Sequence, residues 1–346
     1  MAGLDGVNVE LETQARIKAL ADVTVRDIKE RYKMGSELGR GRFSVVFDAA
    51  HLAENASYAV KEVKNESLHD EENLEALETE INILRQLQHP HIVTLKEVVA
   101  TSTYTYIVME LLSGGELFNR IVEKSCFPES DAKPLFAQIM LSMEYLHSLN
   151  IVHRDVKPEN ILYICPGGND IKLIDFGYAG VWATDKPLTG LCGTPDYVAP
   201  EVLTWYEDED QGTPYGKGSD MWSLGVLLYV ILSGCSPFSG DDEEQLLKLV
   251  QEAKYEFYEN EWQGISENAK DLIRKLLVVD PTQRLTMEEV ISHPWLAETV
   301  GKCRAEMATK TTKKMSRVGS NGAVPPAGIT AQSQSEPRTG CACAIL

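Results

Sequence analysis

One short polar segment carries three side chains of different chemistry. In HRDVKPEN at 153–160, Asp155 provides a carboxylate, Lys157 an ammonium and Asn160 a carboxamide within six residues. An apolar-periodic stretch ends at Leu149 just before this segment and a short β-like run follows it, so we expect a loop between a helix and a strand. Because loops held by rigid elements are where catalytic groups usually lie, we place the chemistry of the chain here.

Another carboxylate, Asp175, ends the apolar run IKLID at 171–175. Burying this charged carboxylate at the end of a strand would cost free energy unless a cation were bound beside it. Magnesium would satisfy it, because a hard cation takes oxygen ligands and also bridges the phosphates of a nucleotide. Asp175 therefore predicts a site for a metal ion and a nucleotide.

A glycine-rich loop, GRGRFSVV at 39–46, fits the same nucleotide. Its two glycines are a weak signal alone, because such a pair also opens a dinucleotide-binding helix or forms a hairpin turn. The β-branched and aromatic residues at 45–47 favour a loop between two strands. Since glycines let backbone amides approach phosphate oxygens closely, we interpret the loop as a phosphate cover.

A lysine and an acidic helix follow the loop. Lys61 ends the strand-like YAVK at 58–61, and an amphipathic helix is expected where the acidic run 71–80 leads into apolar residues. Glu80, at the apolar boundary, is our choice for the partner of Lys61, and Glu78 is the nearby rival. A third interpretation is that these acidic residues only form the solvated face of a helix.

In this order the motifs resemble those of protein kinases. The resemblance extends from Tyr32 to Trp295, and ELLSGGELF, CGTPDYVAPEVL and HPW are most similar to the calcium/calmodulin-dependent protein kinase group. It implies an α+β fold of two lobes, a small β-rich N-lobe over about 32–112 and a larger, mainly helical C-lobe over about 113–296, with ATP in the cleft. The implied activity is transfer of the γ-phosphoryl group of ATP, with Mg²⁺, to a serine or threonine hydroxyl.

The resemblance also assigns roles to single residues. Asp155 would accept the proton of the attacking hydroxyl, and Lys157 would lie beside the transferred phosphoryl group. Asn160 and Asp175 would hold magnesium, while Lys61 would pair with the α- and β-phosphates. The whole set implied for catalysis is Asp155, Lys157, Asn160, Lys61, Glu80 and Asp175.

The adenine would meet the end of a buried strand at 106–112. Met109 would border the pocket as its gatekeeper, and the last residues of the strand would bind adenine through backbone hydrogen bonds. Glu116 is a ribose contact in the family. The nucleotide contacts that the resemblance implies are Leu38, Gly39, Arg40, Gly41, Arg42, Phe43, Ser44, Val46, Ala59, Lys61, Met109, Glu110, Leu112, Glu116, Glu159, Asn160 and Asp175.

Charge restricts the partners. The net charge of −19 argues against a nucleic-acid binder, since a phosphate backbone demands a basic face. It suits a basic protein substrate. The resemblance implies a preference for arginine three residues before the target hydroxyl, with Glu116 and Glu159 as candidate readers. We expect no nucleic-acid partner and a monomer.

The segment between DFG at 175–177 and APE at 199–201 departs from the commonest pattern of the family. Many relatives carry a phosphorylatable threonine two residues before the cysteine of CGTP, where this chain has Gly190. Thr189, one place earlier, is therefore our candidate phosphosite. Arg154 would be a natural partner for its phosphate.

Further positions suggest structural roles. By resemblance, Asp220 would brace the catalytic loop from below, and Arg284 would pair with Glu201. The most apolar run, 221–232, is too short to span a bilayer and predicts a buried helix.

Residues 1–31 are expected as an N-terminal extension without an assigned function. Leu11, Ile17, Leu20 and Val23 fall at roughly helical spacing and predict a helix. The first 13 residues contain three acids and no apolar run, so we expect no signal peptide. Seven cysteines without a C-x-x-C pair indicate reduced thiols of a cytosolic protein.

The end of the chain is basic, since residues 302–346 carry seven Lys or Arg and two Glu. We expect a basic amphipathic segment at 297–318, where apolar residues recur three or four apart. Such a segment is typical of a calmodulin target or a membrane-surface helix. Because no aromatic anchor is present, calmodulin binding by 300–318 remains one alternative beside a solvated tail.

Residues 319–346 predict a flexible tail, rich in Gly, Pro, Ser, Gln and Ala. The terminal CAIL fits a prenylation box at Cys343, and Cys341 could take palmitate. Lipid and basic charge would then tether a cytoplasmic kinase to the cytosolic face of a membrane. The rival function is a membrane-anchored pseudokinase scaffold. It is disfavoured because a pseudokinase is expected to lack catalytic groups, and all of these groups are present in the sequence.

Overall fold

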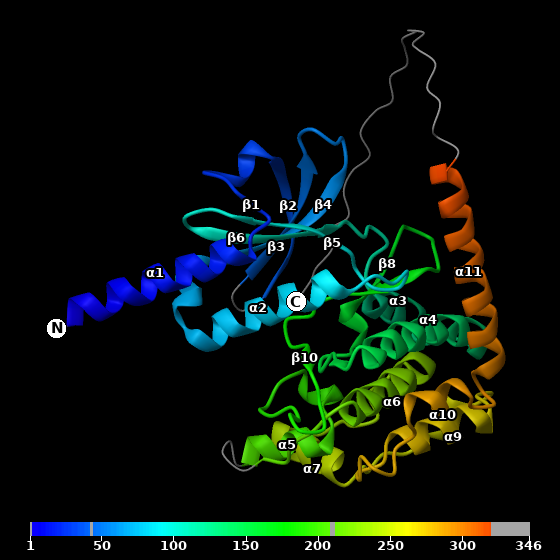
Figure 1. The fold of residues 1–346 in the computed structure, drawn as a ribbon. Helices are drawn as coiled ribbons and strands as arrows, with labels where there is room; N and C mark the ends of the chain where they lie inside the picture. Colours follow the sequence, from blue (N-terminus) through cyan, green and yellow to red (C-terminus); the bar gives the residue numbers. More distant parts are fainter. Residues whose placement is uncertain (1, 42–43, 208–211, 320–346) are drawn as a thin grey trace, which may run out of the picture.

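The computed structural model of the chain describes residues 2–41, 44–207 and 212–319. A lobe containing a β-sheet is followed along the chain by a mainly helical lobe (Figure 1). The predicted α+β class and two-lobed architecture are confirmed.

The small lobe is built on a six-stranded sheet with the order β1-β5-β6-β4-β3-β2. β1 pairs in parallel with β5, and the other neighbours are antiparallel. The strands are β1 Val23–Thr24, β2 Tyr32–Arg40, β3 Ser44–His51, β4 Ser57–Lys64, β5 Leu95–Ala100 and β6 Tyr104–Glu110. Val60 and Val108 pair at the centre of the sheet and are fully buried, as β-branched residues on a packed sheet face usually are.

Helix α2, Glu71–Gln86, packs on this lobe. Asp70 caps its N-terminus by accepting a hydrogen bond from the N–H of Asn73. Its buried apolar residues recur at spacings of three and four, which places them on one stripe: Leu74, Leu77, Ile81 and Leu84. Helix α1, Ala2–Leu20, runs beside it.

The larger lobe consists mainly of helices. They are α3 Leu117–Lys124, α4 Glu129–Ser148, α5 Pro200–Glu207, α6 Gly218–Ser233, α7 Glu243–Gln251, α8 Glu259–Trp262, α9 Glu267–Leu276, α10 Met287–Ile291 and α11 Ala297–Gly319. Its short strands are β7 Ile151–Val152, β8 Ile161–Tyr163, β9 Ile171–Leu173 and β10 Gly180–Val181. The short 3-10 helices of the chain are η1 Ile28–Glu30, η2 Asn65–His69, η3 Pro158–Asn160 and η4 Pro195–Tyr197.

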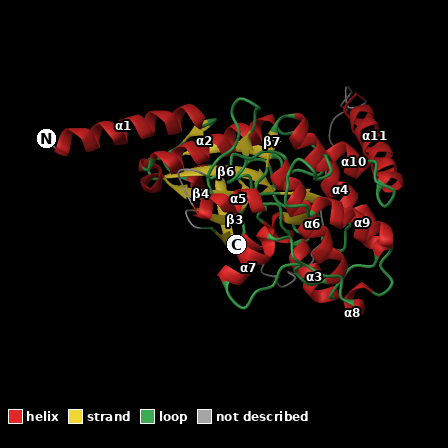
Figure 2. Ribbon diagram, turned by 90° about the horizontal axis from the view of Figure 1, so that it is seen from below, coloured by secondary structure: helices red, strands yellow, loops and turns green. Residues whose placement is uncertain are grey.

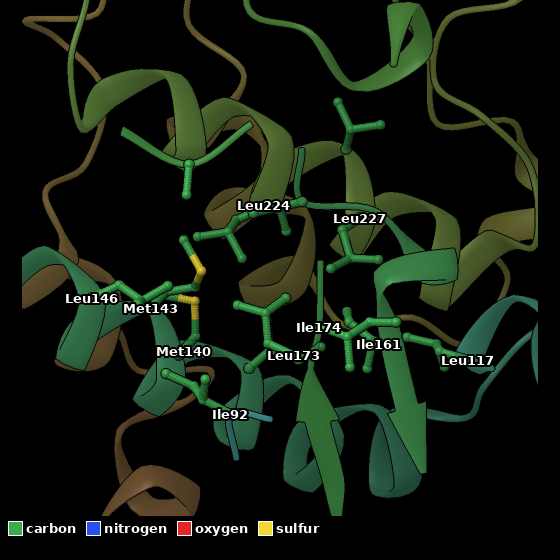
Figure 3. Packing of buried hydrophobic residues seen from close by; sticks show 14 of the residues in the cluster. Ile92, Leu117, Met140, Met143, Leu146, Ile161, Leu173, Ile174, Leu224 and Leu227 are labelled. Atoms are coloured by element: carbon green, nitrogen blue, oxygen red, sulfur yellow. The ribbon is translucent and has the colours of Figure 1, made fainter. Parts of the chain in front are cut away.

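The core of the larger lobe supports the segment in which we place the chemistry. Helix α6 is buried from Ser219 to Ser233, as its apolar run at 221–232 predicts. Leu224 and Leu227 of α6 pack in one cluster with Ile161 of β8 and Leu173 of β9 (Figure 3). Because β7 and β8 flank the polar segment 153–160, this packing fixes both of its ends.

One detail of the predicted N-terminal helix is wrong. Val23 lies in strand β1 instead, because α1 ends at Leu20 and the chain then pairs with the sheet. Asp22 donates its N–H to the carbonyl of Val98 at 2.8 Å and accepts the N–H of Val98 through its side chain at 2.7 Å. Leu11 faces solvent with 65% of its surface exposed.

The two terminal helices lie at opposite ends of the molecule, α1 on the small lobe and α11 on the large one (Figure 2). None of the helices in the described ranges has the length and apolar character needed to cross a membrane. The flexible tail was predicted at 319–346; from residue 320 onward, including Cys341 and Cys343, it lies outside the described residues.

Candidate active site

The segment 153–160 is held from below by one buried carboxylate. Asp220 of α6 accepts hydrogen bonds from the backbone N–H of His153 at 3.0 Å and of Arg154 at 2.9 Å. Burial opposes the charge of Asp220, but the bond to His147 at 2.8 Å and these N–H groups hold its pKa below the usual range. Arg154 has φ 66°, a strained left-handed conformation that persists only where the surrounding structure imposes it.

Asp155 is surrounded by donors. Thr194 donates its hydroxyl to Oδ1 at 2.8 Å, and Asn160 donates its side-chain amide to Oδ2 at 2.9 Å. Lys157 Nζ lies 3.1 Å from Oδ2 and also donates to Thr194 Oγ1 at 2.8 Å. A hydroxyl is therefore held between a carboxylate and an ammonium, the arrangement that a general base and a charge-stabilising group would need.

Lys61, on β4, lies between two carboxylates. Its Nζ donates to Oε1 of Glu80 at 2.6 Å and lies 3.7 Å from Oδ1 of Asp175. Burial would lower the pKa of Lys61, yet the two acids hold it above its usual range, so the ammonium is charged. The rival Glu78 points elsewhere and pairs with Arg16.

Asp175 and Asn160 offer a small set of ligand atoms to a cation. Asp175, with φ 55°, accepts the N–H of Gly177 through Oδ1 at 3.1 Å, and in the described residues no donor is bonded to its Oδ2. The described ranges hold no cluster of three or more His, Cys, Asp or Glu that could bind a metal alone. Two protein ligands suit Mg²⁺, which usually binds through one or two side chains together with phosphates and water. The residues therefore fit a magnesium ion that arrives with a nucleotide.

A pocket opens beside Lys61 between the two lobes. Eleven of the predicted nucleotide contacts line it: Leu38, Arg40, Gly41, Ser44, Val46, Ala59, Lys61, Met109, Glu110, Leu112 and Asp175. Four do not line this pocket: Gly39, Glu116, Glu159 and Asn160. Arg42 and Phe43 lie outside the described residues. The wall also includes residues that were not among the predicted nucleotide contacts, namely Glu80, Leu84, Val93, Leu111, Leu162, Ile174 and Phe176.

Strand β6 ends at this pocket, and the backbone just beyond it is available to a ligand. The side chain of Glu110 is occupied by Lys172 at 2.6 Å and by the N–H of Thr94 at 2.7 Å. Among the described residues, no acceptor is bonded to the backbone N–H of Leu112, which borders the pocket. A planar base can therefore be bound by backbone groups here.

Two carboxylates, Glu116 and Glu159, lie outside the pocket wall and close together. One oxygen of each is buried without a hydrogen-bond partner in the described part of the chain. Burial raises the pKa of Glu116 to about 7, and the neighbouring charge of Glu159 adds to the rise. Buried carboxylate oxygens without a partner favour a cationic ligand.

Among the described residues, no hydrogen bond joins Arg154 to Thr189 of the segment 175–201, its predicted partner. Arg154 donates to the carbonyl of Tyr178 and to the hydroxyl of Tyr215 at 3.2 Å. Tyr215 in turn donates to the carbonyl of Gly190 at 2.9 Å, while Thr189 is exposed to solvent.

The far end of that segment is closed by a buried ion pair. Both terminal nitrogens of Arg284 bind Glu201, at 2.7 and 2.6 Å. The pair that the sequence predicts is therefore present.

Comparison with known proteins decides the family. A family model described as protein kinase domain matches residues 32–296. The chain belongs to the protein kinase family. Myosin light chain kinase A of Dictyostelium discoideum is 43% identical over 271 residues, which cover 78% of this kinase and 89% of the relative. A protein described as a probable myosin light chain kinase of the same organism is 40% identical over 278 residues, 79% of this kinase and 68% of the relative.

The relatives support the predicted class. Another protein described as a probable myosin light chain kinase is 38% identical over 314 residues, 89% of this kinase and 87% of the relative. The chain is a protein serine/threonine kinase, a phosphotransferase whose family uses ATP.

Sequence reasoning placed Thr194 in a stretch that resembles a substrate-docking segment but did not predict its contacts with the catalytic residues. Thr194 contacts both Asp155 and Lys157 although it is 39 residues away from Asp155. Its place in CGTP, a fixed distance before APE, is the signal that could have indicated these contacts. The apolar wall residues, such as Leu162 and Val93, carry no such signal, because their types are those of any core residue.

Proposed function

We propose that this kinase transfers the γ-phosphoryl group of ATP to serine or threonine in basic proteins that carry arginine three residues before the target. The observation that supports the reaction is the hydroxyl of Thr194 bound between Asp155 and Lys157. A substrate hydroxyl that approaches the same carboxylate would be held in the same way. The unpaired oxygens of Glu116 and Glu159 support the preference for arginine.

The catalytic roles follow from these contacts. Asp155 accepts the proton of the incoming hydroxyl, and Asn160 keeps its carboxylate oriented through the 2.9 Å bond. Lys157 provides a positive charge beside the hydroxyl, where negative charge develops on the transferred group. Bound Mg²⁺-ATP supplies the phosphoryl group and a cation that neutralises charge on the phosphates.

Nucleotide positioning would come from three side chains. Lys61, kept charged by Glu80, would bind phosphate oxygens that project into the pocket. Asn160 and Asp175 would hold the ion. Since little covalent chemistry is left to the protein, its contribution would be positioning and charge stabilisation.

The specificity is tested by comparing two peptides that differ at one residue. The expected result with Mg²⁺-ATP is a KM about tenfold or more lower for Arg-x-x-Ser than for Ala-x-x-Ser, because one charge-assisted hydrogen bond contributes roughly 1.5–3 kcal/mol. Equal KM values for the two peptides would refute the preference for arginine.

Helix α11 supports a second proposal, regulation by calmodulin. Its Val300 is buried, while Arg304 and Lys310 bind Glu144 and Asp170 of the large lobe at 2.6 and 2.7 Å. A calmodulin complex would take these basic residues away from the lobe. Phosphorylation of the peptide is measured with and without calcium-calmodulin, and no change in rate together with no binding in a pull-down would refute the proposal.

We also propose that the end of the chain binds membranes through a lipid on Cys343, aided by palmitate on Cys341 or by the basic residues of α11. One lipid anchors only marginally, so a second signal is required. Intact-mass measurement of protein from eukaryotic cells should show a geranylgeranyl group. Unmodified protein in those cells would contradict the lipid. If calmodulin also binds the basic residues of α11, calcium-calmodulin should reduce liposome flotation, and undiminished flotation would contradict this competition.

Phosphorylation of Thr189 is a further proposal. The side chain of Thr189 is exposed, and the hydroxyl of Tyr215 contacts both the carbonyl of Thr189 at 3.5 Å and Arg154 at 3.2 Å. The described partners of Arg154 are a carbonyl and this hydroxyl, so its charge is available to a phosphate. Mass spectrometry of active enzyme should find the phosphate. Its absence, together with full activity of T189A, would refute the proposal.

A further inference from the structure

Helix α1 packs against α2, the helix that carries Glu80. Thr13, Ile17 and Leu20 recur at spacings of four and three residues and are all buried, so one stripe of α1 faces the protein. Ile17 is only 1% exposed and belongs to the main hydrophobic cluster, as does Leu20. The C-terminal half of α1 is therefore a packed part of the small lobe.

Arg16, next to this stripe, binds α2 at two points. Its Nε and Nη2 donate to the two carboxylate oxygens of Glu78, each at 2.8 Å, and its Nη1 donates to Oε1 of Glu71 at 2.6 Å. These hydrogen bonds hold the pKa of Glu78 below its usual range. A planar guanidinium that binds both oxygens of a carboxylate fixes its orientation as well as its distance.

A third contact lies at the other end of α2. Arg85 donates to the carbonyl of Leu20 and to Oδ1 of Asp22, which is itself bonded to strand β5. Glu71, Glu78 and Arg85 are seven residues apart, so they lie on nearly the same face of α2. The segment from Arg16 to Asp22 thus holds α2 at its first turn, its middle and its last turn.

Glu78 and Glu80 face different neighbours for a geometric reason. Two residues on a helix with 3.6 residues per turn differ by about 200° in direction. Glu78 therefore points to α1 while Glu80 points to Lys61, at 2.6 Å. A rotation of α2 that moved Glu80 away from Lys61 would also pull Glu78 off Arg16.

We propose that Arg16 is a positioning residue for the phosphoryl transfer. By holding Glu78 it keeps α2 in the rotation at which Glu80 meets Lys61, and so it keeps the nucleotide site assembled. This inference rests on the proposed role of Lys61 and Glu80 in binding phosphate. It gives the N-terminal extension a function that its sequence did not indicate.

The test uses two charge reversals on the same helix of the full chain. R16E places a third carboxylate beside Glu71 and Glu78, whereas K18E makes the same change at an exposed position two residues further on. R16E should lower kcat about fivefold to thirtyfold, because the new carboxylate repels Glu71 and Glu78 where the guanidinium bound them, and K18E should leave kcat unchanged.

A second comparison separates positioning from general damage. In an E80Q background the contact with Lys61 is already weakened, so R16E should add little further loss of kcat if it acts through Glu80. Equal kcat for R16E and K18E would overturn the proposal. A loss from R16E that is as large in the E80Q background as in the wild type would also overturn it.

Hydrogen exchange of the nucleotide-free proteins provides a readout that needs no substrate. Amides of α2 should exchange about fivefold to thirtyfold faster in R16E than in K18E, while those of buried α6 should not change. If the wild type does not phosphorylate the arginine peptide, the substrate proposal fails but this comparison still decides the role of Arg16. Unchanged exchange in α2 would refute that role.

Discussion

Because of the carboxyl group of Glu116, we predict that binding of an arginine peptide weakens as the pH falls. Burial raises the pKa of Glu116 to about 7, and the charge of Glu159 adds to the rise. Below this pH the acid is mostly neutral, whereas a substrate arginine requires the carboxylate. Protonation and peptide binding therefore compete, and the KM for an arginine peptide should rise as the pH falls through 7.

The size of the effect follows from the ionised fraction. With a pKa of about 7, that fraction falls from about nine tenths at pH 8 to about one tenth at pH 6, so the KM should rise about tenfold. E116Q removes the charge at every pH, so its KM should be high throughout and independent of pH. E159Q removes the neighbouring charge, so the midpoint should move below pH 7.

The assay measures initial rates at saturating Mg²⁺-ATP between pH 6 and 8 with Arg-x-x-Ser and Ala-x-x-Ser peptides. The ratio of their kcat/KM values cancels titrations that affect both substrates equally. A ratio that does not change between pH 6 and 8, or one that changes equally in E116Q, would refute the assignment of Glu116 as a reader of arginine.

Two further predictions concern contacts around the site. R284A should lower the free energy of unfolding by about 3–5 kcal/mol, measured by denaturant unfolding, because the buried Glu201 would lose both of its ion-pair bonds; an unchanged midpoint would contradict this. T194A should lower kcat about tenfold by removing the hydroxyl bound to Asp155, whereas T194S should retain most of the activity, and equal rates for the two variants would show that the hydroxyl is dispensable.

Polar residues that motif spacing singled out lie close together in the folded chain. Lys61, Asp155 and Asp175 come from three separate motifs, yet Asp175 lies 3.7 Å from Lys61 in the folded chain. Such groups can be predicted because their chemistry restricts both residue type and position. The α+β fold followed from the same ordered motifs.

Other contacts could not be predicted, for physical reasons. Leu162 and Phe176 line the pocket, but apolar residues of these types also fill any core. Helical spacing extended through Val23, yet strand pairing with β5 overrode it. The apolar boundary of the helix correctly favoured Glu80 over Glu78, but the contact of Glu78 with Arg16, more than 60 residues away in sequence, could not be predicted.

The central claim is that Asp155 acts on the hydroxyl during phosphoryl transfer. The most direct measurement is single-turnover transfer from Mg²⁺-ATP to the arginine peptide by the wild type and by D155N, beside the nucleotide affinity of each. We predict that the rate falls by about 10²–10⁴ in D155N, the usual contribution of a positioned general base, while nucleotide affinity stays nearly the same. Transfer by D155N at the wild-type rate would contradict the account.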